Sequence, residues 1–120
     1  MSDFTTAKTF TQGLFEIIVD WTHEDLPLSY VFETEEEIEE HATRCNDYTD
    51  THYRARVRAM YDGKEFGNHQ LGSCYAYDCS PETDIENGIS GYLEQMVEQA
   101  VAEAQDACGT MLEQMQKDFA

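Results

Sequence analysis

The sequence predicts an α+β domain: a small antiparallel sheet of three to four strands, with one short helix and one long C-terminal helix packed on one face. Two observations predict this class. Apolar and polar side chains alternate every second residue over 14–21 and 52–61, a pattern typical of half-buried strands. Apolar side chains recur at helical spacing after residue 34 and again after residue 83. With 120 residues, 41% of them apolar, the chain suits a single domain over 1–120 with a substantial core.

The segment LFEIIVDW at 14–21 predicts the first strand. Glu16 and Asp20 share its polar face. The opposite face carries four apolar side chains: Phe15, Ile17, Val19 and Trp21. A turn at HEDLP follows, and LSYVF at 28–32 is interpreted as a second short strand.

The block TEEEIEEH at 34–41 predicts the start of the short helix. Thr34 and Glu37 have the spacing of a capping box, and acids are favourable in a first turn because of the helix dipole. A narrow apolar stripe runs along this helix through Ile38, Ala42 and Cys45. We expect the helix to end near Asn46-Asp47.

The segment HYRARVRAMY at 52–61 predicts the next strand, with Arg54, Arg56 and Arg58 on one face. The other face carries Tyr53, Ala55, Val57, Ala59 and Tyr61. DGKEFGN then predicts a turn, signalled by Asp62-Gly63, and HQLGSCYAY at 69–77 predicts the returning strand.

The C-terminal third predicts a long helix over 83–118. Ser80-Pro81 is typical of an N-cap followed by a first helical residue, and Thr83 with Glu86 offers a second capping box. An unbroken helix of this length would measure about 54 Å, more than so small a domain requires. We therefore expect either a break at Gly109 or a homodimer formed through the long helix.

The charge of the chain is extreme, since 7 Lys and Arg face 25 Asp and Glu, a net charge of −18. Such a field repels nucleic acids and anionic membranes and favours a basic protein partner. No membrane span or signal peptide is visible, which predicts a cytoplasmic chain whose cysteines are thiols.

Two sets of acids are the candidate partner-binding surface. They lie on the two predicted helices and comprise Glu35, Glu36, Glu39, Glu40, Glu94, Glu98, Glu103 and Asp106. The long helix opposes its acids with Lys117 alone, so we expect them to be unpaired. Carboxylates one helical turn apart are separated by roughly 6 Å, close to two phosphate steps along a nucleic-acid strand. Rows of acids on a rigid helix can therefore resemble a phosphate backbone.

The arginine-bearing strand has two interpretations. If it pairs with the strand at 14–21, its arginines form cross-strand ion pairs with Glu16 and Asp20. Otherwise they form a basic patch for an acidic ligand or for the acidic helix of a second copy.

A zinc site is a weaker alternative, because His41 and Cys45 lie one turn apart and Cys74 and Cys79 follow later in the chain. However, the four-residue gap between these last two cysteines is looser than a zinc knuckle. A buried thiol also behaves as a small apolar group. We expect no cofactor.

The sequence carries no catalytic signature, with no G-x-S-x-G, no P-loop and no dinucleotide fingerprint, so we do not expect an enzyme. The leading hypothesis is a small acidic inhibitor that occupies the basic groove of a nucleic-acid-binding protein. In size and charge the chain is similar to the small acidic proteins by which phages block restriction or CRISPR systems. The alternatives are a halophile-type acidic domain and a Cys/His metal-binding domain or small enzyme.

Overall fold

The computed structural model describes the backbone of residues 3–118 and the side chains of residues 3–109. Its four strands form one antiparallel sheet in the order β1-β2-β3-β4, so each strand pairs with its neighbour in sequence. The strands are β1 (Thr5–Gln12), β2 (Phe15–His23), β3 (Thr51–Tyr61) and β4 (Lys64–Ala76). The helices are α1 (Glu35–Asn46), α2 (Pro81–Glu86) and α3 (Tyr92–Asp118), with short 3-10 turns η1 (Leu28–Tyr30) and η2 (Ile89–Gly91). The predicted α+β class is confirmed.

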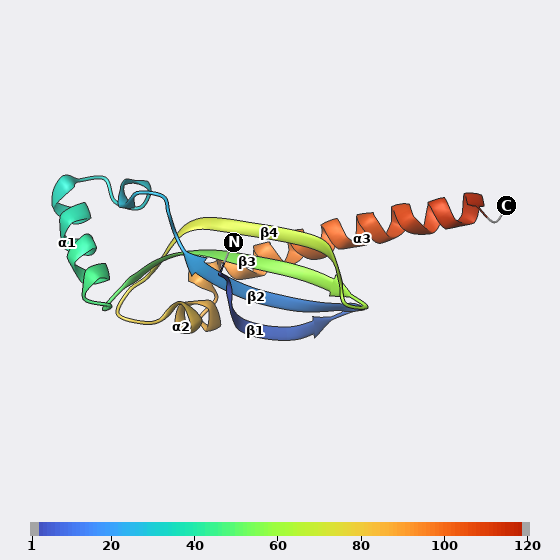
Figure 1. Ribbon diagram of the computed structural model, residues 1–120, viewed down its shortest axis with the longest axis horizontal. Coiled ribbons are helices and arrows are strands. Elements are labelled where there is room, and N and C mark those ends of the chain that lie inside the picture. The colour runs from blue at the N-terminus through green and yellow to red at the C-terminus, as the bar shows by residue number, and fades with distance from the viewer. Residues whose placement is uncertain (1–2, 119–120) are drawn as a thin grey trace.

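The molecule is elongated, with extents of 65 × 28 × 23 Å. Helix α3 packs across β3 and β4 and then continues past the end of the sheet, while α1 stands at the opposite end (Figure 1). The 27 residues of α3 span about 40 Å, which explains the overhang. No helix in the described part of the chain is long and apolar enough to cross a membrane.

The core lies between one face of the sheet and α3. The alternation predicted for 14–21 and 52–61 is present, because Ile17, Val19 and Val57 are fully buried on this face. Helix α3 contributes Met96 and Ala100, which are also buried. The opposite face of the sheet carries the three arginines of β3.

The fourth strand is β1, and the strand expected at 28–32 is absent. β1 reads TTAKTFTQ and lies at the edge of the sheet with most side chains exposed, so it lacks the apolar alternation that marks a half-buried strand. Residues 28–30 instead form the turn η1, in which the amide of Tyr30 donates to the oxygen of Pro27 at 3.1 Å. This turn carries the chain from the sheet to α1, and of residues 28–32 only Phe32 is buried.

The turn before β4 is shorter than expected. Asp62 and Gly63 connect β3 directly to β4, and both have left-handed backbones, with φ of 52° and 76°. Two left-handed residues match the twist of a tight hairpin, so strand pairing resumes at Lys64 rather than at residue 69.

The C-terminal helix breaks at a different place from the one expected. Ser80 is the N-cap, since its hydroxyl accepts from the amide of Thr83 at 3.2 Å, and the second capping box is not used. The chain leaves α2 through Gly88, whose φ is 88°, and restarts as α3 at Tyr92. The α3 backbone then stays helical through Gly109. A left-handed glycine ends a helix readily, whereas Gly109 adopts ordinary helical angles.

Candidate partner-binding surface

Helix α1 presents its five glutamates to solvent. Thr34 caps it as predicted, because its hydroxyl oxygen accepts from the amide of Glu37 at 3.2 Å. The exposed acids are Glu35, Glu36, Glu37, Glu39 and Glu40. Since residues four apart lie on one side of a helix, the predicted acids form two adjacent rows, Glu35 with Glu39 and Glu36 with Glu40. Within each row the carboxylates are about 6 Å apart along the axis.

An aromatic cluster holds α1 against the end of the sheet. The ring of His41 stacks on Phe32 with centroids 3.8 Å apart and planes 13° apart. Tyr75, at the end of β4, meets both rings edge-on at 5.4 and 5.1 Å. His41, considered as a metal ligand, therefore serves as an aromatic contact between α1 and the sheet.

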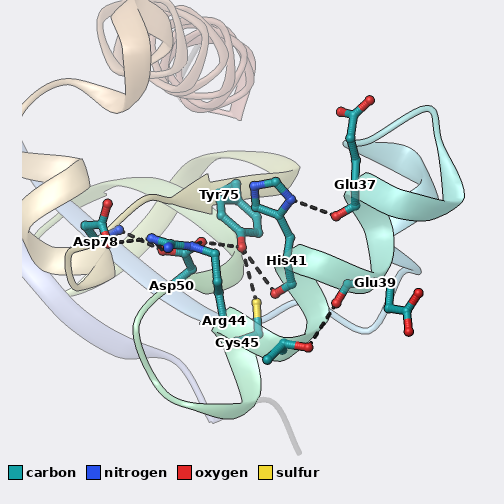
Figure 2. A network of polar contacts seen from close by, with 9 residues as sticks. Glu37, Glu39, His41, Arg44, Cys45, Asp50, Tyr75 and Asp78 are labelled. Atoms are coloured by element: carbon teal, nitrogen blue, oxygen red, sulfur yellow. Dashed lines mark hydrogen bonds and ion pairs between the residues drawn. The ribbon is translucent and has the colours of Figure 1, made fainter.

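A buried carboxylate provides the second attachment of α1 (Figure 2). Arg44 donates to both oxygens of Asp50, from Nε at 2.7 Å and from Nη2 at 3.0 Å. The same carboxylate accepts from the hydroxyl of Tyr75 at 2.6 Å and from the amide of Asp78 at 2.8 Å. Asp50 is 2% exposed, so these partners replace its hydration.

Burial and hydrogen bonding in this network change the pKa values of Asp50 and Tyr75. Burial alone would raise the pKa of Asp50, but the hydrogen bonds from Arg44, Asp78 and Tyr75 outweigh it and lower that pKa to about 2. Burial and the bond to Asp50 together raise the pKa of the Tyr75 hydroxyl. Asp50 is therefore ionised at neutral pH, and its charge is matched within the fold.

The arginines of β3 form cross-strand ion pairs, as one of their two interpretations predicted. Arg56 donates to both oxygens of Asp20 at 2.8 and 2.7 Å, and Arg58 adds a bond at 3.1 Å. Asp20 is 1% exposed, whereas Glu16 is exposed and takes no part in these pairs. Arg54 pairs in turn with Glu24 at 3.4 Å.

Most cations in the described part of the chain thus form ion pairs within the fold. All four arginines pair with carboxylates, and Lys8 lies 3.9 Å from Glu86. The carboxylates of Asp20, Glu24 and Asp50 are nearly buried by these contacts. Because cations and buried acids cancel each other, the exposed acids dominate the field that an approaching molecule meets.

The acids predicted on the long helix do not form one row with each other or with those of α1. Glu94 and Glu98 line a groove of about 490 Å³ beside Lys8 and Phe10 of β1. Glu103 lies nine residues after Glu94, about 180° around the helix, and accepts from the amide of Asn68 in β4 at 3.3 Å.

The expectation that the acids of the C-terminal helical region have no cationic partner is wrong for Glu86, which lies 3.9 Å from Lys8. Other acids of this region accept hydrogen bonds from neutral side chains. Glu82 accepts from the Trp21 indole at 3.0 Å, and Asp84 accepts from the Tyr53 hydroxyl. Asp106 is exposed and also has an interaction partner. The side chains of Glu113, Lys117 and Asp118 lie outside the described part. Local sequence could not reveal these pairs, because each partner is far away along the chain.

The four candidate zinc ligands are not brought together into a site. The Cys45 thiol donates to the Tyr75 hydroxyl at 3.6 Å, and the buried Cys74 thiol donates to the Leu71 oxygen at 3.5 Å. Burial raises the pKa of Cys74 to about 11, which disfavours the thiolate that zinc requires. Among the described residues, no group of three or more His, Cys, Asp or Glu is placed to hold a metal ion.

Sequence reasoning missed the residues that attach α1, namely Arg44, Asp50 and Tyr75. No motif joins them, because each comes from a different element and only the fold brings them together. Comparison with known proteins adds no relative, since no protein-family model, no curated protein and no solved structure matches the chain.

Proposed function

We propose that this chain is a small acidic binding protein that inhibits a nucleic-acid-binding protein by occupying its basic groove. The observation that supports this proposal most is the division of charge: the arginines are paired within the fold, while α1 carries five exposed glutamates at one end of the molecule. That arrangement leaves a strongly negative, protruding helix facing solvent (Figure 1).

The mechanism is competitive. The two rows of carboxylates on α1 pair with lysines and arginines that otherwise hold phosphates, and their spacing of about 6 Å is close to two phosphate steps. The net charge of −18 steers a basic partner toward the complex and speeds association at low salt. Nucleic acid itself is repelled, so the inhibitor does not bind the substrate of its target.

The test is capture from a lysate at low and at moderate salt, with mass spectrometry of the retained proteins. We expect a nucleic-acid-binding protein that is released by salt and displaced by added DNA or RNA. Retention that resists both treatments would contradict charge mimicry and indicate binding through shape and apolar contacts.

Two charge-matched variants locate the interface. Glu36→Lys with Glu40→Lys reverses one row on α1, and Glu94→Lys with Glu98→Lys reverses an exposed pair of the same spacing on α3. We expect the α1 variant to lose at least tenfold in affinity and the α3 variant to lose much less. Equal losses would show that net charge, rather than the α1 surface, carries binding.

We also propose that two copies associate through the long helix, supported by a different observation. Where α3 leaves the sheet, a groove of about 620 Å³ is lined largely by apolar side chains, including Phe66, Val101 and Leu14, which is 79% exposed. Sedimentation velocity at several salt concentrations tests whether this dimer forms. Because two copies of charge −18 repel, the dimer should strengthen with salt, whereas binding of a basic partner should weaken. A monomer at all salt concentrations would contradict it.

A further inference from the structure

A pocket rimmed by three tyrosines lies beside the attachment of α1. It has a volume of about 330 Å³, near the lower end of the roughly 300–1,000 Å³ typical of ligand pockets. Tyr30, Tyr77 and Tyr92 line it, from η1, from the segment after β4 and from the start of α3. These side chains are 67%, 55% and 53% exposed, unusually high for large aromatic groups.

The electrostatic character of the pocket favours a cation. Its lining contains the carboxylate of Asp84 and no Lys, Arg or His. Asp84 accepts one hydrogen bond, from the Tyr53 hydroxyl, and an ionised carboxylate can accept several more. The faces of aromatic rings are negative and attract cations that lie over them. A nucleotide would also stack on tyrosine, but a chain of net charge −18 repels its phosphate.

The walls of the pocket carry unusual backbone and an unpaired polar atom. Ser73, Ile89 and Ser90 have left-handed backbones, with φ of 53°, 50° and 54°, and all three line the pocket. A β-branched residue such as Ile89 rarely adopts this conformation, and such strain concentrates at functional sites. The Ser73 hydroxyl oxygen is buried without a hydrogen-bond partner in the described part of the chain.

The pocket is also continuous with the acidic end of the molecule. The ring centroid of Tyr77 lies 6.0 Å from that of His41 on α1 and 6.5 Å from that of Phe32. A basic segment of the partner that contacts the glutamates of α1 can therefore place a neighbouring side chain in the pocket.

We propose that this pocket receives one arginine side chain of the basic partner, with the guanidinium over the tyrosine faces and hydrogen-bonded to Asp84. Arginine fits better than lysine, because its flat guanidinium stacks on rings and presents five donors. The inference deepens the proposed function and rests on it for the source of the arginine.

The experiment titrates the full chain with N-acetyl-arginine amide and follows backbone amide shifts by NMR. The lysine and glutamine counterparts serve as comparators. We expect saturable shifts confined to residues 30–31, 71–77, 84 and 89–92, strongest for arginine and absent for the neutral glutamine compound. Tyr92→Ala and Tyr30→Ala should each weaken binding about fivefold, the equivalent of one exposed cation–π contact. Tyr92→Phe, which keeps the ring face, should bind within about twofold of the unchanged chain.

Tyr48→Ala is the matched control, because Tyr48 is 92% exposed and does not line this pocket. Shifts spread over the acidic helices and unaffected by Tyr92→Ala would overturn the pocket and leave the proposed function standing. Localised arginine binding without capture of any basic protein from a lysate would support the pocket and count against the proposed function.

Discussion

Helices α1 and α3 are attached to the same sheet by different interactions. α3 packs on the sheet through small and apolar side chains, with Leu93, Met96, Ala100 and Ala104 buried. α1 has no buried residue and is held by an aromatic stack and a charged network. Apolar contact does not depend on protonation, whereas the attachment of α1 does. We infer that the acidic end of the molecule opens before the core does, which suits a surface that adapts to a partner.

Helix α3 lies directly against the backbone of Gly67 in β4. A β-carbon at this position would lie 1.9 Å from the backbone oxygen of Ala100 and 3.1 Å from the nitrogen of Ala104. The absence of a side chain at Gly67, and the small size of the two alanines, let the helix lie directly on the strand.

The largest effect should come from breaking this contact. Gly67→Ala forces α3 away from β4, and we expect a loss of about 3 kcal/mol in the free energy of unfolding, measured by urea titration. Gly109→Ala is the control, because nothing lies within 4 Å of its added carbon. In a helix interior this change should stabilise by up to about 1 kcal/mol. Equal effects of the two substitutions would contradict the close packing.

The next effect should come from the attachment of α1. Asp50→Asn removes the charge and one acceptor from a buried group with three different donor residues, so we expect a loss of about 2 kcal/mol. The matched control, Asp47→Asn at the exposed end of α1, should change stability by less than about 0.5 kcal/mol. Hydrogen exchange should show faster opening of α1 amides in Asp50→Asn, with α3 amides between 93 and 104 little changed. Uniform acceleration in both helices would contradict a local role.

Lowering the pH should distinguish the attachment of α1 from that of α3 without a mutation. The folded-state pKa of Asp50 is about 2, below the ordinary value of 3.8, so its ionised form stabilises the fold above about pH 4. That stabilisation is lost as pH falls from about 4 toward 2. Burial would raise the pKa of Glu24, but hydrogen bonds from the Ser73 and Leu26 amides and from Arg54 lower it. Protonation of Glu24 therefore also destabilises the fold as the pH falls. We expect α1 amides to lose protection before α3 amides in this range. In Asp50→Asn, whose α1 amides are already less protected, the same fall in pH should cause no further selective loss at α1.

The smallest effect should come from salt. Screening weakens repulsion among the exposed acids, so raising NaCl from 0.1 to 0.5 M should stabilise the fold by about 1 kcal/mol or less. The buried pairs of Asp20 and Asp50 should respond little. A chain that unfolds at 0.1 M salt would instead support the halophile-type interpretation and weaken the case for a dedicated binding surface.

Local signals predicted what depends on neighbours in sequence. The capping of α1 by Thr34, the end of that helix at Asn46, the buried face of β3 and the Ser80 cap all follow from spacing that a single segment satisfies by itself. The alternation of side chains over 14–21 also placed Asp20 on the polar face of its strand. Pairing of this strand with β3 was the only further assumption needed to predict Asp20 as a partner for the arginines.

Tertiary structure decided the features that need contacts between distant segments. β1 is a strand because β2 offers it an edge, although its own side chains are mostly polar. Asp50 is buried because Arg44, Tyr75 and Asp78 converge on it, and the tyrosine pocket exists because η1, β4 and the start of α3 meet. The composition determined that this protein is strongly acidic. Which acids are neutralised and which face a partner was decided only by folding, because the fold places each cation beside particular carboxylates.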